Sequence, residues 1–510
     1  MNVFIRADSS EQIGTGHVMR CLALAETLRA NGVDVSFVCR DLPGNAGRVV
    51  RQAGFPLHQL PQFGDCAVRD ESGWFGGVDW ATDAKQTMAV VSSGRAVDWL
   101  FADHYGIDHR WESHLRPAAG RIAVIDDLAN RRHECDLLVD QNLHADTQTR
   151  YHGLVPPESV VFCGPKYALL RPEFARARAA LKTRDGQLKR ILVSFGGTDA
   201  ANQTCKALQA IASLDRRDIA VDVVVGASNR HQVAVRELCE AHSNFTLYLQ
   251  SCNMAELMAA ADLCIGAGGV TTWERCCLGL PSVVISVAAN QEASIRIMAE
   301  EGRLLYLGTH AEVKAESIVR VLAALEVLPH WLQLLAARSV PLVDGRGAER
   351  VVRQILLPAI CLRLAGLQDC RDIYEWRNAA ENRQHSFDSG VFAFADHEAW
   401  YKATLSRSDR VLLIGEAHNS PVGVLRYDLK GQCANVSVYL VPGKHCQGLG
   451  SKLLHSGSEW LRKNHPEVRE VLADIQIANQ ASQAAFSQAG YEPYFCTHKL
   501  KLRQLEHEKK

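Results

Sequence analysis

A histidine stands directly behind a glycine turn near the start of the chain. Gly14-Thr15-Gly16 precedes His17, between a run that predicts a strand and a run that predicts a helix. Such a turn exposes backbone N–H groups at a helix N-terminus, where the positive end of the helix dipole suits phosphate. We expect His17 to lie beside that phosphate as a neutral base, because the helix N-terminus disfavours the imidazolium. The alternative is an N-capping or packed histidine.

Two further glycine turns occur at corresponding places later in the chain. Gly196-Gly197-Thr198 and Gly268-Gly269 each follow a predicted strand and precede a predicted helix. One such turn is as often a tight connection, whereas three together favour a diphosphate ligand. Glu274, on the following helix, can accept both ribose hydroxyls of a nucleotide, or it is a solvated helix residue. A P-loop lysine and a full GxGxxG pattern are both missing, which argues against an NTPase or a nicotinamide dehydrogenase.

The elements that must position these residues form two successive βα halves. Strands are predicted at 3–6, 35–39, 99–102, 121–125 and 137–139, and the pattern restarts with strands at 189–194, 221–225, 246–249, 262–265 and 282–287. The charged stretch 176–190 is the predicted connection. We expect an α/β fold with two Rossmann-like lobes, 1–180 and 181–357, that bind ligands at the carboxyl ends of their strands.

The composition changes after Pro358. A strand at 361–364 and a helix at 369–378 are followed by antiparallel strands at 411–416, 422–427 and 434–440. Gln447-Gly448-Leu449-Gly450 then precedes a helix, a strand at 470–475 and a helix from about 480. These elements predict an α+β domain over 358–510.

Composition narrows the class of protein. The 510 residues carry 56 Lys and Arg against 57 Asp and Glu, so bulk charge favours neither nucleic acid nor an anionic membrane as a partner. The 16 cysteines form no CxxC pair and no zinc-ligand spacing, which predicts reduced, mostly buried thiols. Arg6 and Asp8 interrupt any signal peptide, and no run approaches ~18 apolar residues. We therefore expect a cytoplasmic protein without a membrane span. The sequence does not determine the oligomeric state, and a monomer is the default expectation.

Six separated motifs in the first 340 residues resemble one family. They are RADSSxxIGTGHxxR (6–20), DHYGID (103–108), IDD (125–127), CGPKYALLRPEF (163–174), SFGGTD (194–199) and NQE (290–292). The chain resembles the UDP-2,4-diacetamido-2,4,6-trideoxy-β-L-altropyranose hydrolases of pseudaminic acid (nonulosonate) biosynthesis, a route implying decoration of flagellin or surface glycans. The resemblance implies the GT-B fold of the N-acetylglucosaminyl transferase that makes lipid II, with water in place of a sugar acceptor.

The resemblance also implies roles for individual residues. His17, Tyr105 and Asn290 match the catalytic histidine and the cleft residues near the sugar. The implied UDP- and substrate-binding set is Arg6, Gly14, Gly16, Arg171, Gly196, Gly197, Thr198, Asp199, Gly268, Gly269, Glu274 and Gln291. Hydrolysis at C1 with inversion would expel UDP, and helix N-termini with loop amides would stabilise it without a metal. His17 would orient or deprotonate the water, or act electrostatically on the β-phosphate or the sugar.

Two acidic pairs stay ambiguous in the sequence. Asp126-Asp127 is either a metal-binding pair or a structural strand end, and the structural role is favoured. Asp103-His104 is open in the same way. No metal is expected.

The last 150 residues resemble the GNAT acetyltransferases. The glycine loop after Leu440-x-Pro442 would wrap the coenzyme A pyrophosphate, and Asn479 matches the asparagine of the next strand–helix loop. The implied acetyl-CoA-binding set is Leu440, His445, Gln447, Gly448, Leu449, Gly450, Ser451, Lys452, Asn479 and Phe486. His445 replaces the usual Arg or Gln, and Phe486 replaces the Tyr that protonates the thiolate, so Tyr491, another hydroxyl or water would have to do so.

The two resemblances imply consecutive steps in one bifunctional chain. Its C-terminal half would transfer acetyl from acetyl-CoA to the 4-amino group of UDP-4-amino-4,6-dideoxy-N-acetyl-β-L-altrosamine, and its N-terminal half would then remove UDP. The alternatives are a GT-B glycosyltransferase with a UDP-sugar donor, a related diamino-sugar substrate, a nucleotide-sugar sensor, and a hydrolase with a degenerate GNAT domain.

Overall fold

The computed structural model describes residues 1–62, 78–181, 183–226, 229–249, 253–386, 389–445 and 448–494. The chain divides into two compact units, Met1–Ile355 and Leu356–Lys510. The first unit contains two sheets and the second contains one. The predicted lobe boundary after residue 180 stays a prediction.

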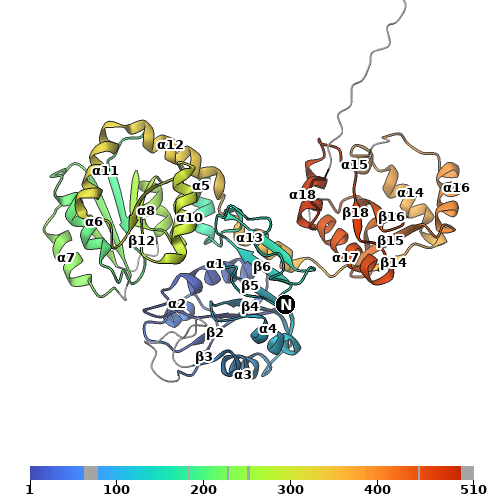
Figure 1. Cartoon of the computed structure of the whole chain (residues 1–510), viewed down its shortest axis with the longest axis horizontal. Coiled ribbons are helices and arrows are strands. Elements are labelled where there is room, and N and C mark those ends of the chain that lie inside the picture. The colour runs from blue at the N-terminus through green and yellow to red at the C-terminus, as the bar shows by residue number, and fades with distance from the viewer. Residues whose placement is uncertain are drawn as a thin grey trace, which may run out of the picture. The chain divides into compact units, whose positions relative to one another are not determined.

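The first sheet is parallel and reverses its strand order once, at β1 and β4. The order is β3-β2-β1-β4-β5-β6-β7, and Ala7 pairs with Asp103 where β1 and β4 end. Figure 1 shows β6, β5, β4, β2 and β3 in succession. The carboxyl ends of β1 and β4 therefore form a topological switch point, where doubly wound sheets bind ligands. The strands are β1 (Asn2–Ala7), β2 (Asp34–Arg40), β3 (Leu57–Leu60), β4 (Val97–Asp103), β5 (Ala119–Ile125), β6 (Leu137–Asp140) and β7 (Val160–Cys163); the helices are α1 (Gly16–Ala30), α2 (Gly47–Gln52), α3 (Trp80–Val91) and α4 (His109–Leu115).

The second sheet repeats this architecture with its switch point at β8 and β11. Its order is β10-β9-β8-β11-β12-β13, and all pairs are parallel. The strands are β8 (Arg190–Ser194), β9 (Ala220–Val225), β10 (Phe245–Leu249), β11 (Leu263–Ala267), β12 (Ser282–Ser286) and β13 (Leu305–Thr309); the helices are α6 (Gln203–Ala212), α7 (Gln232–Glu240), α8 (Met254–Ala260), α9 (Thr271–Cys277), α10 (Ala289–Glu300), α11 (Ala315–Val327) and α12 (Pro329–Ser339).

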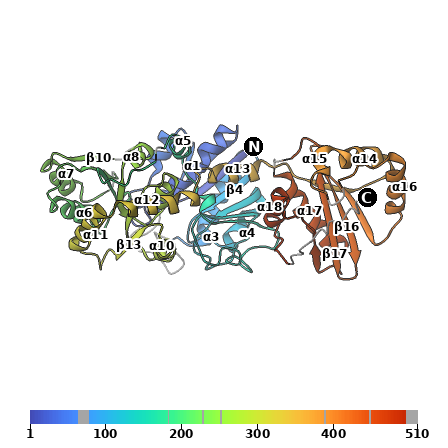
Figure 2. The ribbon, with the colours of Figure 1, turned by 90° about the horizontal axis from the view of Figure 1, so that it is seen from above.

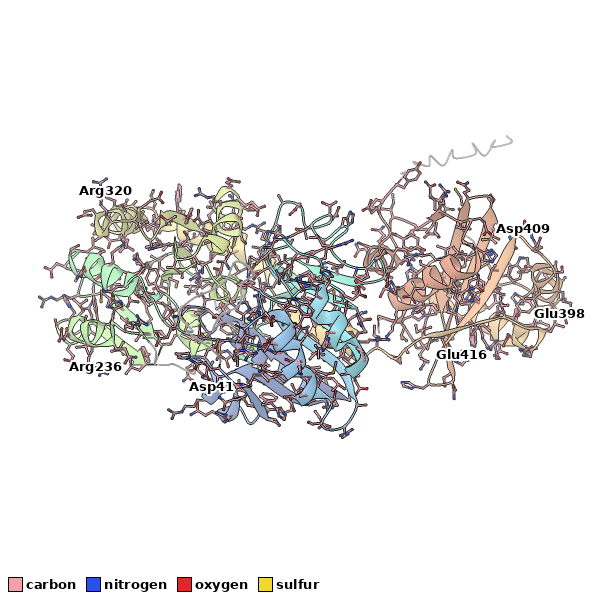
Figure 3. All side chains as sticks on the ribbon, turned by 60° about the horizontal axis from the view of Figure 1, so that its bottom comes forward. Asp41, Arg236, Arg320, Glu398, Asp409 and Glu416 are labelled. Atoms are coloured by element: carbon pink, nitrogen blue, oxygen red, sulfur yellow. The ribbon has the colours of Figure 1, made fainter. Side chains whose placement is uncertain are left out.

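Both faces of the second sheet are covered by apolar side chains. Ile191 and Val193 of β8 belong to one buried cluster, and Leu192 between them belongs to another. Successive strand residues point to opposite faces, so a near-continuous apolar run is what a sheet covered on both sides requires. Charged side chains such as Arg236 and Arg320 extend outward from the helices (Figure 3).

The connection between the lobes is partly helical, which corrects the predicted linker at 176–190. Its first residues belong to α5 (Pro172–Ala179), and the connecting segment follows that helix. The last helix of the unit, α13 (Gly347–Leu356), lies against the chain just before α5, because Arg350 Nη1 donates to the Lys166 carbonyl at 2.7 Å.

The second unit holds a mixed five-stranded sheet in the order β14-β15-β16-β17-β18. The first three pairs are antiparallel, and Figure 2 shows the long strands β16 and β17. β17 pairs with β18 in parallel over Cys433–Asn435 only, because β18 ends at Leu472 and is shorter than predicted. The elements are β14 (Cys361–Leu364), β15 (Arg410–Ala417), β16 (Ser420–Lys430), β17 (Cys433–Leu440), β18 (Glu470–Leu472), α14 (Cys370–Asn378), α15 (Ala380–Arg383), α16 (Phe394–Leu405), α17 (Leu449–Asn464) and α18 (Gln480–Gln488).

Within the described ranges, no single helix has both the length and the apolar character needed to cross a membrane. One helix pair, Ala315–Val327 with Pro329–Leu356, passes by length and composition but is bent by 98°.

A buried charge cluster fastens β1, β2 and α3 together. Arg6 Nη2 and Arg40 Nη2 donate to Asp83 Oδ2 at 2.6 and 2.5 Å, and Trp111 Nε1 donates to Oδ1 of the same carboxylate. Arg6 also donates to Asp8. Burial by itself raises the pKa of Asp83, but the two guanidinium groups more than compensate and hold it well below its usual range.

We expect Asp83→Asn to lower the free energy of unfolding of the first unit by about 3–5 kcal/mol, because it leaves two buried guanidinium groups without their shared counter-charge. Denaturant unfolding of the full chain measures the loss. Asp34→Asn is the matched control, because the Arg95–Asp34 pair is exposed and such pairs contribute about 0–1 kcal/mol. Equal losses for both variants would contradict the assignment.

Candidate functional site

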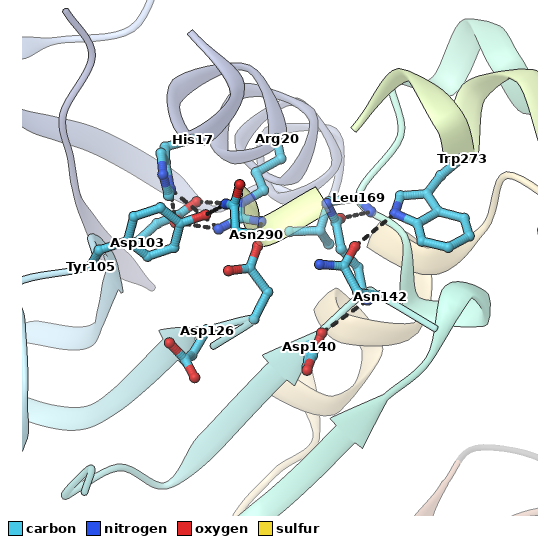
Figure 4. Close-up of polar contacts among 12 residues, drawn as sticks. His17, Arg20, Asp103, Tyr105, Asp126, Asp140, Asn142, Leu169, Trp273 and Asn290 are labelled. Atoms are coloured by element: carbon cyan, nitrogen blue, oxygen red, sulfur yellow. Dashed lines mark hydrogen bonds and ion pairs between the residues drawn. The ribbon is translucent and has the colours of Figure 1, made fainter. Parts of the chain in front are cut away.

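His17 lies on the first turn of α1, above the switch point of the first sheet (Figure 4). Its Nδ1 is 2.5 Å from Oδ1 of Asp103, the last residue of β4. Asp103 is 0% exposed and the His17 side chain 9%. Two residues far apart in the sequence therefore meet because β1 and β4 are neighbours.

Arg20, one turn after His17, binds the same carboxylate. Arg20 Nε donates to Asp103 Oδ2 and Nη2 donates to Oδ1, both at 2.7 Å. Burial by itself raises the pKa of Asp103, but Arg20 and then His17 lower it well below the usual range. Arg20 Nη1 also donates to Asp127 Oδ2 at 3.1 Å. The carboxylate of Asp103 is thus ionised and shared between a guanidinium and an imidazole.

Tyr105 and Asn290 join the same cluster from opposite lobes. The Tyr105 ring packs edge-on against His17, with centroids 4.6 Å apart at 82°. Asn290 Nδ2, from α10 of the second sheet, donates to the Tyr105 hydroxyl at 3.0 Å. Burial, followed by Asp127, raises the pKa of Tyr105 far above its usual value, so this hydroxyl stays protonated. All three residues predicted near the sugar are brought together.

The three glycine turns also converge. The position that a Cβ would occupy at Gly197 lies 3.4 Å from Thr15 Oγ1, and that at Gly16 lies 3.7 Å from Val270. Each turn follows a switch-point strand: β1, β8 and β11. A Cβ at Gly268 would collide with the Ile295 side chain, so any larger residue there would have to displace that side chain. Gly269, Gln291 and α9 lie at the same edge, where the Gly269 Cβ position is 3.5 Å from Gln291 Nε2.

Glu274 and Arg171 form the far side of this region. The Arg171 guanidinium lies 4.0 Å from Glu274 Oε1, and both side chains keep partial exposure, 18% and 13%. Burial raises the pKa of Glu274, and Arg171 opposes that shift. The pair combines an acceptor for hydroxyl groups with a donor for anionic oxygens.

Three residues of the predicted binding set have partners within the protein. Arg6 is 0% exposed and its guanidinium is taken by Asp8 and Asp83, so it organises the lobe and offers no surface to a ligand. Asp199 accepts from the backbone amides of Gln203 and Thr204, so its carboxylate caps α6 and occupies the helix end that sequence reasoning assigned to phosphate. Gly14 donates its amide to the Ser10 carbonyl and shapes the turn at φ 77°.

Asp126 has the structural role that the sequence favoured. It is fully buried, accepts from the Ala129 amide and the Tyr151 hydroxyl, and lies 2.8 Å from Arg131 Nη1. In the described part of the chain, no group of three or more His, Cys, Asp or Glu side chains is arranged to hold a metal ion. The expected independence from metal stays a prediction.

A hydrogen-bonded chain across the lobes was missed from the sequence. Asp140 Oδ1 accepts from the Asn142 amide, and Asn142 Oδ1 accepts from Trp273 Nε1, next to Glu274 (Figure 4). Arg20 was also missed as a site residue, although RADSSxxIGTGHxxR ends on it, one helical turn after His17.

The glycine loop of the second unit leads into a long helix. Gly448 adopts φ 78° at the N-cap of α17, and Asn479 Oδ1 accepts from the Ser482 amide at the start of α18. Leu449 is buried, Gly450 follows it in α17, and Ser451 Oγ donates to the Gly448 carbonyl. The Leu440 carbonyl, at the open end of β17, accepts from Asn382 Nδ2. Gln447 lies outside the described residues.

Other residues predicted to bind acetyl-CoA have protein partners. Phe486 is 6% exposed and packs edge-on against Tyr491 in the core, so it contributes packing and no surface to a ligand. Lys452 Nζ donates to the Leu357 carbonyl at 2.7 Å. His445 Nε2 lies 3.2 Å from the Glu381 carboxylate. Burial raises the pKa of the Tyr491 hydroxyl.

Comparison with protein families identifies a domain in each unit. Residues 191–321 match the glycosyltransferase family 28 C-terminal domain, and residues 370–491 match the acetyltransferase (GNAT) family. The expected GNAT domain is confirmed, and the two matched domains support an enzyme.

Curated relatives match more than half of the chain. The UDP-2,4-diacetamido-2,4,6-trideoxy-β-L-altropyranose hydrolase of Campylobacter jejuni is 28% identical over 59% of this chain and 97% of its own length. The spore coat polysaccharide biosynthesis protein SpsG of Bacillus subtilis is 26% identical over 69% and 96%. An uncharacterised protein of Methanocaldococcus jannaschii is 26% identical over 56% of this chain, which spans only 55% of that protein. The resemblance to the hydrolase is confirmed.

Among solved structures, MurG of Acinetobacter baumannii is 16% identical, with a TM-score of 0.47 over 69% of this chain and 99% of its own. The chain has the expected α/β class, with two Rossmann-like sheets followed by an α+β domain.

His104 gives the lobe a pH-dependent stability. Its Nδ1 accepts from the Gly106 amide at 2.9 Å, so the ring is neutral, with the proton on Nε2, 3.5 Å from Asp8. Burial lowers its pKa from the usual 6.5 to about 4. A histidine with a lowered folded pKa contributes stability above the unfolded value, and that stability is lost as the pH falls from about 6.5 towards 4.

We expect unfolding at pH 5 to show a loss of about 2 kcal/mol relative to pH 7 that His104→Asn removes, because Asn keeps an acceptor for Gly106 but cannot become charged. Denaturant titrations at the two pH values measure the difference. The exposed His152 supplies the control, His152→Asn, which should retain the full pH dependence. An unchanged pH dependence in His104→Asn would overturn the assignment.

Proposed function

From a chain that joins a glycosyltransferase family 28 C-terminal domain to a GNAT domain, we propose a bifunctional enzyme of nucleotide-sugar metabolism. Its first unit hydrolyses UDP-2,4-diacetamido-2,4,6-trideoxy-β-L-altropyranose to UDP and the free sugar. Its second unit transfers acetyl from acetyl-CoA to the 4-amino group of UDP-4-amino-4,6-dideoxy-N-acetyl-β-L-altrosamine. Both steps belong to pseudaminic acid biosynthesis, and the Campylobacter relative supports this assignment.

One observation carries the hydrolase proposal. The switch points of two separate sheets meet, so that three glycine turns converge beside His17, Tyr105 and Asn290. Backbone amides at such turns bind diphosphate, and a general base beside them lies close to the bond that joins the diphosphate to a sugar.

The reaction follows from this placement. A water molecule attacks C1 of the sugar on the face opposite UDP, the new C1–O bond forms, and the bond between C1 and the phosphate oxygen breaks. Its electron pair leaves with UDP, and the configuration at C1 inverts. His17 Nε2 takes the proton of the water, a role typically worth ~10²–10⁴-fold.

UDP is stabilised by groups of the second lobe. The turns at Gly196-Gly197-Thr198 and Gly268-Gly269 bind the diphosphate, while Glu274 binds the ribose and Arg171 and Gln291 lie beside them. Because Asp199 already caps α6, this proposal places the anion on loop amides and the start of α9. Tyr105 and Asn290 contact the sugar.

The acetyltransferase step uses the second unit. The 4-amino nitrogen attacks the acetyl carbonyl carbon, the N–C bond forms, and the C–S bond breaks with its electron pair on sulfur. The amine proton leaves to solvent, and the thiolate takes a proton from water or the Tyr491 hydroxyl. The turn before α17 binds the coenzyme A pyrophosphate, and the part of β17 beyond Asn435, where β18 no longer pairs with it, offers backbone groups to the acetyl arm.

Hydrolysis is tested in isotopic water. In H₂¹⁸O, with the diacetamido UDP-sugar and no acceptor, we expect the wild type to release UDP and place ¹⁸O in the sugar, because the C1–O bond breaks. His17→Gln should lower kcat by ~10²–10⁴-fold. Label in UDP would mean cleavage at phosphorus. UDP release that requires an added sugar acceptor would favour the glycosyltransferase.

Acetyl transfer is tested by mass spectrometry with the 4-amino substrate and acetyl-CoA. We expect Gly450→Asp to lower transfer at least about 100-fold, because it sets a carboxylate against the pyrophosphate, while hydrolysis of pre-acetylated substrate stays unchanged. Gly431→Asp, in the β16–β17 turn, is the matched control. Absence of transfer in the wild type would indicate a degenerate GNAT domain.

A further inference from the structure

The imidazole of His17 contacts a charged side chain from outside its own helix. Asp103 Oδ1 lies 2.5 Å from Nδ1, shorter than the ~2.7–2.9 Å that is typical of a charge-assisted N–H···O⁻ hydrogen bond. Arg20 Nη2 lies 3.2 Å from the same nitrogen. An ionised carboxylate can only accept a hydrogen bond, so the contact with Asp103 requires that Nδ1 carries the proton. A guanidinium can only donate and would need an unprotonated Nδ1, but its contact is the longer of the two. The neutral ring then has its lone pair on Nε2, which has no hydrogen-bond partner among the described residues.

The Asp103 carboxylate makes more contacts than a single ion pair would give it. Arg20 binds both oxygens of Asp103 in a fork, and Cys21 Sγ donates to Oδ2 at 3.4 Å. An isolated buried carboxylate would become protonated, and a protonated Asp103 would no longer orient the imidazole. Arg20 therefore keeps Asp103 ionised and fixes the direction of the oxygen that faces His17.

A second carboxylate balances the charge of the cluster. Asp127 Oδ2 lies 3.1 Å from Arg20 Nη1, and its side chain is 10% exposed. With His17 neutral, Arg20 and the two carboxylates sum to one negative charge. When Nε2 takes a proton, the imidazolium brings that sum to zero, so the buried cluster loses net charge as the base becomes protonated.

We infer that Asp103, clamped by Arg20 and balanced by Asp127, is the positioning residue that fixes His17 as the Nδ1–H tautomer and presents Nε2 to the sugar. This inference rests on the proposed hydrolysis for the identity of the acceptor, because the proton that Nε2 takes is that of the attacking water. The alternative is a purely structural Arg20–Asp103 pair. Such a pair has no need of a third partner, yet His17 lies closer to Asp103 than Arg20 does.

The decisive measurement is the tautomer of His17 in the full chain. Long-range ¹H–¹⁵N correlation spectra of ¹⁵N-histidine-labelled protein separate protonated from unprotonated ring nitrogens, and the His17→Gln spectrum identifies the His17 signals. We expect protonated Nδ1 and unprotonated Nε2 in the wild type. A wild-type Nε2–H tautomer would falsify the inference, and this result needs neither substrate nor a second variant.

Measurements of kcat and KM then distinguish a positioning role of Asp103 from a purely structural one. We expect Asp103→Asn to lose the fixed tautomer and to lower kcat by ~10²–10⁴-fold, with KM within about threefold, because the substrate contacts remain. Asp108→Asn is the matched control, because this carboxylate lies in the same loop after β4 but binds Arg110 at the start of α4. It should keep both the tautomer and kcat.

The outcomes distinguish the two proposals. Asp103→Asn with kcat within tenfold of the wild type would overturn the positioning role. A wild type that releases no UDP, while His17 still shows the Nδ1–H tautomer bound to Asp103, would refute the hydrolysis and support the geometry. If Asp103→Asn does not fold, the wild-type spectrum decides alone.

Discussion

The order of the strands is the constraint on which the rest of the first unit depends. In each parallel sheet the chain starts in the middle, moves to one edge and returns to the other side of its first strand. Right-handed crossovers put the helices on one face while the chain moves towards one edge and on the other face after it reverses, so α6 and α7 pack on one face of the second sheet and α8, α9 and α10 on the other. The carboxyl ends of the two central strands are left without a covering connection. His17, Asp103 and the three glycine turns all lie at these ends. The strand order therefore sets the position of the candidate site, whichever side chains occupy it.

Much of the fold was readable from the sequence, because fully buried parallel strands are near-continuous apolar runs. The ends of β8, β9 and β12 fall within one residue of their predicted positions, and β11 extends two residues further than predicted. The short edge strand β3, LHQL, was missed, because its exposed central residues hide the pattern. α6 begins only at Gln203, because Asp199 and Asn202 adopt positive φ and delay the helix that was predicted to follow the glycine turn.

Some site residues could be predicted from local sequence motifs, whereas others could not because their contacts are formed only in the folded chain. Tyr105 and Asn290 were found through motifs, and the structure brings them together with His17. The motifs do not indicate which side chains form hydrogen bonds within the protein. Arg6 and Asp199 were therefore predicted to bind the ligand, although both side chains hydrogen-bond to other protein groups. Arg20 and Asp103 meet through a contact between residues 83 positions apart, which no local pattern encodes. Pairing of buried charges is a tertiary property.

The hydrogen bond from Asn290 to Tyr105 gives the first unit a further property. It joins groups that belong to two separately wound sheets, so the complete constellation exists only in molecules whose lobes are in register. The measured affinity for a ligand that needs both lobes is then its intrinsic affinity scaled by the fraction of such molecules. The affinity for a nucleotide that binds the second lobe alone is not reduced by this fraction. The affinity for inhibitors derived from the sugar would therefore depend on how the two lobes are aligned, whereas the affinity for inhibitors derived from the nucleotide would not.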